Sequence, residues 1–146
     1  MAKVEISTVI NRPVEEVFAF LSNQDNNPKW QSGAVEVKKT SDGPIGVGTT
    51  WRSVGTFLGR RIESEEEITE YEPNRKYTTK SKSGPFPFES RTTFERVESG
   101  TKINLVAEAE IGGFFKLAEP LVVSMGKRQF EADLANLKDL MEAHAV

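Results

Sequence analysis

Apolar and polar residues alternate through most of the chain, in short segments that turn residues separate. In residues 3–10, Val4 and Ile6 fall on one side and Glu5 and Ser7 on the other, which is the pattern of a half-buried strand. We expect further strands wherever this alternation returns: around Val35 and Val37 and in residues 48–58, 61–71, 75–82, 86–97 and 101–111.

Helical spacing interrupts this alternation near the start of the chain. Apolar residues between Val14 and Leu21 recur at i, i+3, i+4 and i+7, and Pro13 before them suits the first turn of a helix. Residues 28–30 predict a second, short helical turn that places Trp30 against the first helix or against the edge of the sheet.

A longer helix is predicted at the end of the chain, beginning at Glu119 or Pro120, while Leu121 and Met125 point away from its apolar stripe. A glycine on the buried face of a helix costs roughly 1 kcal/mol relative to alanine. Gly126 therefore indicates either a kink in the helix or open space above it. The stripe contains Val122, Gly126, Phe130, Leu134, Leu137 and Met141.

These elements predict one α+β domain over residues 1–146. Strands joined by short turns pair antiparallel, and a sheet with one apolar face needs a cover on that face. The C-terminal helix is the only predicted element long enough to provide it. We therefore expect a curved antiparallel β-sheet of about seven strands wrapped around a long C-terminal α-helix, with two short helices after the first strand.

Composition narrows the function classes. A net charge of −3 argues against a general nucleic-acid binder, and no apolar run is long enough to span a membrane. The chain has no cysteine, and its one histidine, His144, stands at the end, so we expect neither a metal site nor a cofactor. We expect a cytoplasmic protein, and its sequence leaves a monomer and a homodimer open.

Several segments are similar to those of a known family: INRPVEEVFAFLSN (10–23), NPKW (27–30), VGTTW (47–51), ITEYEPNRKY (68–77) and LANLKDLMEA (134–143). Together they resemble the polyketide cyclase/dehydrase-like branch of the SRPBCC superfamily, which also includes START domains and the birch-pollen-allergen type. The resemblance covers essentially the whole chain and implies the helix-grip fold. It also implies a cavity between sheet and helix for apolar or amphipathic small molecules, but no shared catalytic motif.

The residues expected to line that cavity share the inward face of the strands or the covering stripe of the last helix. A mostly apolar and aromatic lining with few polar groups is typical of a small-molecule pocket, although a filled core has the same pattern. The predicted ligand-binding residues are Trp51, Ser53, Phe57, Glu66, Ile68, Tyr77, Phe86, Phe88, Ser90, Thr92, Phe94, Val122, Gly126 and Phe130.

Glu66 is the one candidate catalytic residue. Strand parity places it on the same face as Ile62 and Ile68, where burial would raise the pKa of its carboxyl group and suit it to acid–base chemistry. A bulge would instead turn it outward into the acidic run 63–67, and that run favours the outward position. Tyr77, also inward, could offer its hydroxyl to a ligand, but donation to a backbone carbonyl is the commoner arrangement.

Three functions remain open at this point. The first is a carrier or sensor of a small hydrophobic molecule, which we favour because no nucleophile–base pair or metal cluster is evident. The second is a polyketide cyclase/dehydrase-like enzyme acting in the same cavity, since such catalysis works largely by positioning. The third is a protein-interaction module that uses Leu121 and Met125 on the rear of the last helix.

Overall fold

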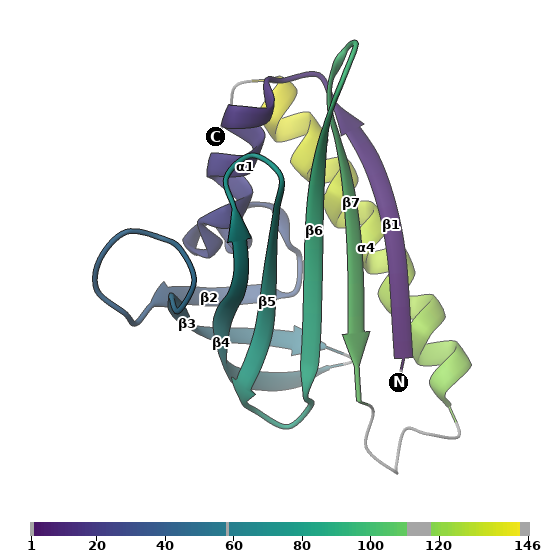
Figure 1. The fold of residues 1–146 in the computed structure, drawn as a ribbon. Coiled ribbons are helices and arrows are strands. Elements are labelled where there is room, and N and C mark those ends of the chain that lie inside the picture. Colours follow the sequence, from purple (N-terminus) through teal and green to yellow (C-terminus); the bar gives the residue numbers. More distant parts are fainter. Residues whose placement is uncertain (1, 58, 111–117, 144–146) are drawn as a thin grey trace.

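In the computed structural model, one antiparallel sheet of seven strands curls around a long C-terminal helix (Figure 1). The structure describes residues 2–57, 59–110 and 118–143, and the side chain of Phe57 is not described. The predicted position of His144 therefore lies outside the described residues.

The elements follow one another as a strand, short helices, a meander of strands and a final helix. The meander places each strand beside the next, and β1 pairs with β7, so the sheet order is β1-β7-β6-β5-β4-β3-β2. The bounds are β1 (Ala2–Ile10), α1 (Val14–Ser22), the 3-10 turn η1 (Gln24–Asn26), α2 (Asn27–Trp30), β2 (Ala34–Lys39), β3 (Thr50–Phe57), β4 (Arg60–Glu72), β5 (Lys76–Ser83), β6 (Phe88–Val97), β7 (Gly100–Ala109) and α4 (Glu119–Glu142).

At the turn between β6 and β7, the end of the first strand, β1, lies close to the start of the last strand, β7. Gly100 has φ of 154°, and a Cβ atom built on it would collide with the carbonyl oxygen of Ile10 at the end of β1. Glycine is suited to this close approach of two backbones because it has no side chain. The Thr101 hydroxyl then donates a hydrogen bond of 2.9 Å to the carbonyl oxygen of Arg12, which fixes the exit of β1.

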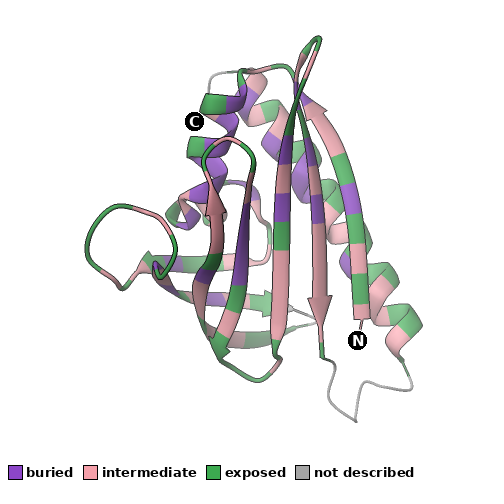
Figure 2. Ribbon diagram, in the orientation of Figure 1, coloured by how far each residue is buried: buried purple, intermediate pink, exposed green. Residues whose placement is uncertain are grey.

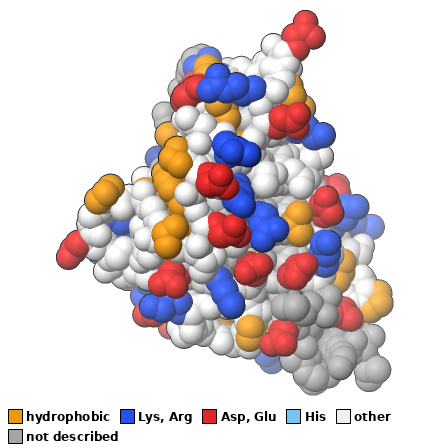
Figure 3. All heavy atoms as spheres, in the orientation of Figure 1, with side chains coloured by type: hydrophobic (Ala, Val, Ile, Leu, Met, Phe, Trp, Pro, Cys, Tyr) orange, Lys and Arg blue, Asp and Glu red, His pale blue; other side chains and the backbone are white. Residues whose placement is uncertain are grey.

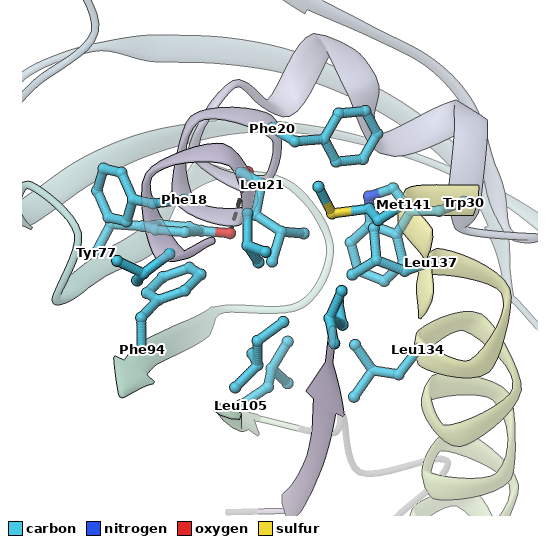
Figure 4. Packing of buried hydrophobic residues seen from close by; sticks show 14 of the residues in the cluster. Phe18, Phe20, Leu21, Trp30, Tyr77, Phe94, Leu105, Leu134, Leu137 and Met141 are labelled. Atoms are coloured by element: carbon cyan, nitrogen blue, oxygen red, sulfur yellow. Dashed lines mark hydrogen bonds between the residues drawn. The ribbon is translucent and has the colours of Figure 1, made fainter. Parts of the chain in front are cut away.

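The main hydrophobic core lies under the C-terminal half of α4 and against α1. Figure 4 shows Leu134, Leu137 and Met141 of α4 in one cluster with Leu21 and Trp30. Aromatic rings extend this core toward the sheet, because Phe18 of α1 packs edge-on against Tyr71, Tyr77 and Phe94, with ring centroids 5.4, 6.1 and 5.0 Å apart. On α4 this cluster extends no further toward the N-terminus than Phe130.

The opposite face of the sheet is polar. Figure 2 shows buried and exposed residues mixed along each strand, and Figure 3 shows acidic and basic side chains interleaved on the face turned away from α4. On this face Glu70 accepts a bond of 3.0 Å from Lys76 and lies 3.3 Å from Arg91. One face of the sheet is therefore covered and the other faces water, as the alternating pattern predicts.

The predicted architecture is confirmed, from the seven-stranded antiparallel sheet to the short helices after β1 and the long final helix. The predicted start of the last helix is also right, because α4 begins at Glu119. Within the described ranges, no helix is long and apolar enough to cross a bilayer.

Candidate functional site

A cavity of about 400 Å³ lies between the inner face of the sheet and the N-terminal half of α4. Pockets that hold small molecules in proteins generally measure 300–1,000 Å³. Arg60 and Glu110 border the cavity and are exposed, so they mark a side that opens to solvent. The helix contributes only apolar side chains and one glycine to the lining: Val122, Val123, Gly126, Phe130 and Leu134.

Gly126 explains why this space is open. The residue is buried, yet a Cβ atom added to it would meet no heavy atom of the described residues within 4 Å, apart from its neighbours in the helix itself. The helix runs through this position without interruption, from Glu119 to Glu142. Of the two explanations that the sequence allows, open space above the helix is therefore the one that the structure supports.

The sheet supplies a largely apolar wall. Phe88 on β6 pairs with Ala109 on β7, which pairs in turn with Ala2 on β1, and all three border the cavity. The small alanine side chains leave room in front of these strands, while Phe86 and Phe88 provide aromatic surface. Such a lining favours a ligand with an apolar body, because burial of apolar surface is the main source of its binding free energy.

Polar groups gather where the cavity meets the short helices. Gln24 of η1 donates a hydrogen bond of 2.7 Å from Nε2 to Oγ1 of Thr79 on β5, and both side chains are buried. The Tyr77 hydroxyl donates to the carbonyl oxygen of Leu21 at 3.2 Å, the commoner of the two arrangements predicted for it (dashed line in Figure 4). Burial raises the pKa of Tyr77 to about 12, so its hydroxyl group stays protonated at neutral pH.

Glu66 borders the cavity, so the outward position that the acidic run favoured is wrong. The pairing of β4 with β5 is irregular at two places, and at the one beside Glu66 the extra residue belongs to β5. The pairing of β4 with β3 is regular and keeps Glu66 on the face of Ile62. Burial raises the pKa of the Glu66 carboxyl group to about 7, and a hydrogen bond with Ser64 acts in the opposite direction. This carboxyl group therefore changes its charge near neutral pH.

Most of the predicted lining residues border the cavity in the structure. They are Ser53, Glu66, Tyr77, Phe86, Phe88, Ser90, Thr92, Val122, Gly126 and Phe130. Their contact with a ligand stays a prediction. The predicted role of Phe57 in the lining also stays a prediction, because its side chain is outside the described structure.

Trp51, Ile68 and Phe94 do not border the cavity, and their predicted place in its lining is corrected. Trp51 and Ile68 are fully buried in a second hydrophobic cluster with Val37 of β2. Phe94 packs against Phe18 of α1, with ring centroids 5.0 Å apart. All three lie on the inward face, as expected, but other side chains cover them, and strand parity does not contain that information.

The cavity is also lined by residues that the sequence pattern does not predict. Gln24 and Asn27 lie in a polar segment that is typical of a helix end, and the pattern predicts only a packing role for Trp30. The Nε1 atom of Trp30 is buried and has no hydrogen-bond partner among the described residues. No sequence signal marks these residues as lining, because their place depends on how η1 and α2 cross the end of the sheet.

The described residues contain no group of three or more His, Cys, Asp or Glu side chains that could hold a metal ion. The arrangement of the site is thus an apolar cavity with a few hydrogen-bonding groups and one carboxyl group that titrates near neutral pH.

Comparison with known families agrees with this geometry. A family model described as polyketide cyclase/dehydrase and lipid transport matches residues 1–142. The chain belongs to this family. The match spans every described helix and strand from β1 to α4, so the family assignment and the fold rest on the same elements. A comparison with curated protein sequences gives no match.

Solved structures show the same fold at low sequence identity. TTHA0849 from Thermus thermophilus has a TM-score of 0.84 and 21% identity, with 99% of each chain covered. The Zhui aromatase/cyclase from Streptomyces sp. R1128 has a TM-score of 0.80 and 13% identity, covering 99% of this chain and 95% of its own. The di-domain aromatase/cyclase StfQ of the steffimycin biosynthetic pathway has a TM-score of 0.79 and 13% identity, covering 99% of this chain and 51% of its own.

Proposed function

We propose that this protein binds a small hydrophobic or amphipathic molecule in the cavity between the sheet and α4, as a carrier or sensor. The observation that carries the proposal is the open space at Gly126, where a buried helix position leaves room instead of packing against the sheet. Membership of a family described by polyketide cyclisation, dehydration and lipid transport supports a ligand of this kind.

A thermal-shift screen tests the proposal. The panel contains fatty acids, sterols, flavonoids and aromatic polyketides. A ligand present at a hundred times its dissociation constant adds about 2.7 kcal/mol to the free energy of unfolding. For a chain of this size that raises the melting temperature by roughly 5–11 °C.

Two variants of α4 locate the binding site. Gly126→Leu places a side chain in the cavity, and we expect it to abolish the thermal shift. Ser124→Leu adds the same side chain at an exposed position of the same helix and should leave the shift intact. Absence of any shift across the panel, or equal shifts in both variants, would count against ligand binding in this cavity.

A second candidate function is a polyketide cyclase/dehydrase-like enzyme that uses the same cavity. The observation that favours it is Glu66, because a general base works best when its pKa lies near the operating pH. In such a reaction the Glu66 carboxylate would take a proton from a carbon beside a carbonyl group of the substrate. The apolar walls of the cavity would hold the substrate in position.

Turnover separates the two candidates. Once a ligand class is known, the enzyme hypothesis predicts product formation that Glu66→Gln reduces by 10²-fold or more while the thermal shift remains. A ligand recovered unchanged after prolonged incubation with the native protein would favour the carrier or sensor.

A further inference from the structure

The charged groups at the cavity are unbalanced. Among the described residues that border it, the carboxylates are Glu66, Glu108 and Glu110, and the one basic side chain is Arg60. Arg60 and Glu110 are exposed, so water screens their charges. Glu66 is half-buried on the inward face of β4, whereas Glu108 alternates with the inward residues Ala107 and Ala109 and so has the outward parity. The charge of Glu66 is therefore the one directed into the cavity.

Glu66 has no cationic partner in the described part of the chain. Its hydrogen-bonding neighbour is Ser64, and no lysine or arginine contributes to the environment of its carboxyl group. Glu70 on the outer face of the same strand shows the contrast, since it pairs with Lys76 at 3.0 Å and Arg91 at 3.3 Å. A carboxylate that is largely buried is normally paired, and no described residue provides a cation for Glu66, so a ligand could supply one.

None of the described neighbours of Glu66 in the sheet provides a positive charge. Trp51 on β3 and Ser81 on β5 stand opposite it in the sheet, and neither side chain carries a charge. Tyr77 on β5 is a neutral neighbour, and Gln24 of η1 is occupied with Thr79. The lining residues of α4 are all apolar or glycine.

We infer that the cavity selects an amphipathic ligand with a cationic head group, such as an amine, which pairs with Glu66 while the apolar body lies between the sheet and α4. This inference rests on the proposed function, because it assigns a ligand class to the same cavity. A neutral ligand of the same shape would keep the apolar contacts and lose the charge pairing. An anionic ligand would place a second negative charge near Glu66, which is unfavourable.

The pairing predicts a pH dependence. Because the pKa of Glu66 is about 7, roughly a tenth of the protein carries the ionised form at pH 6 and about nine tenths at pH 8. Tyr77 stays neutral across this range, and Arg60, Glu108 and Glu110 are the other charged groups at the cavity. The affinity for a ligand that is cationic at both pH values should therefore rise about tenfold from pH 6 to pH 8.

A matched series of probes tests the inference: 2-(1-naphthyl)ethylamine, 2-(1-naphthyl)ethanol and 1-naphthylacetate. They share an aromatic body and carry a cationic, a neutral and an anionic head group at pH 8. Isothermal titration calorimetry should show the amine binding about tenfold more tightly than the alcohol, since a charged pair is stronger than a neutral hydrogen bond, and the acetate binding most weakly.

Variants assign the preference to Glu66. Glu66→Gln should remove the advantage of the amine over the alcohol and its pH dependence, while retained alcohol binding shows that the cavity is still folded. Glu70→Gln makes the same chemical change on the outer face of the same strand, away from the cavity, and should leave the preference intact. Gly126→Leu should abolish binding of all three probes if they occupy this cavity.

Calorimetry gives a second readout. Binding of the amine at pH 7 should release about half a proton, because the cation favours the ionised form of Glu66, whereas the alcohol should release none. Titrations in two buffers of different ionisation enthalpy measure this release.

The other outcomes overturn the inference in distinguishable ways. Tightest binding of the acetate, or an amine preference unchanged in Glu66→Gln, refutes the cationic head group and leaves the proposed function standing. If none of the three probes binds while a compound of the thermal-shift panel does, the cationic head group is also refuted and the proposed function stands. Failure of the probes and of the panel together refutes both.

Discussion

Nε2 of Gln24 donates a hydrogen bond of 2.7 Å to Oγ1 of Thr79, and both residues border the cavity. Gln24 belongs to the turn η1 after the first helix, and Thr79 lies in the middle of β5, 55 positions further along the chain. Both side chains are buried, so water does not replace the bond if it is lost. This contact fixes the short helices over the end of the sheet and shapes the cavity there.

Thr79→Val should destabilise the protein by about 1–3 kcal/mol, because it leaves the Gln24 amide buried without its acceptor at nearly constant volume. Urea denaturation at pH 7 measures the change in the free energy of unfolding. The double variant Gln24→Leu/Thr79→Val removes both polar partners and should cost less than the sum of the two single substitutions. Additive effects would show that the hydrogen bond contributes little.

The alternation of residues was sufficient to predict the sheet and its inward face. Ser53, Ser90 and Thr92 border the cavity as parity requires, because each strand places every second side chain on the covered face. Parity does not say what stands in front of an inward residue. Phe94 is inward but packs against Phe18, a contact that depends on where α1 crosses the sheet.

Glu66 shows a second limit of prediction from sequence. Its acidic neighbours suggest a solvated strand face, and only the pairing of β4 with β3 decides the matter. The alternative prediction required a bulge that turns Glu66 outward, but the two irregularities lie between β4 and β5, and the one beside Glu66 has its extra residue in β5. The sequence contains no signal for which neighbouring strand accommodates the extra residue.

Gly126→Leu should keep or raise the free energy of unfolding while it closes the cavity. Leucine is a better helix former than glycine by up to about 1 kcal/mol, and a Cβ atom at this position meets open space. Thermal and urea denaturation without ligand measure the change. Gly126→Ala gives the gain in helix propensity without filling the cavity and serves as the reference.

A loss of several kcal/mol in Gly126→Leu, with Gly126→Ala unaffected, would contradict the open space. It would show that the sheet side chains already reach this position and that the leucine is overpacked.

Asp133 connects α4 to the segment before β2. Its Oδ1 atom accepts a hydrogen bond of 3.1 Å from the backbone N–H of Ser32, and its side chain is buried. We expect Asp133→Ala to lower the free energy of unfolding by about 1.5–3 kcal/mol, the range for hydrogen bonds to charged groups. Asp133→Asn keeps an acceptor at this place and should lose less in the same denaturation experiment. Equal losses would assign the effect to charge alone.

The free energy of unfolding should depend on pH through Glu66. Its pKa is about 7 in the folded protein and 4.5 in a free carboxyl group, so the folded state binds more protons than the unfolded state between these values. Stability from this group is therefore complete below pH 4.5 and is lost as the pH rises to 7. Glu66→Gln, which has no charge to bury, should be more stable than the native protein at pH 8 by about 1–3 kcal/mol.

Urea denaturation of both proteins between pH 5 and pH 8 measures this difference, and Glu70 supplies the control on the outer face of the same strand. Hydrogen bonding to Lys76 lowers the pKa of Glu70, so its contribution to stability is present above pH 4.5 and is lost as the pH falls. Glu70→Gln should therefore leave the change in the free energy of unfolding between pH 5 and pH 8 as it is in the native protein. It should alter the pH dependence only below pH 5. A native slope that survives in Glu66→Gln would show that another group titrates in this range and that the Glu66 carboxylate is not held away from water.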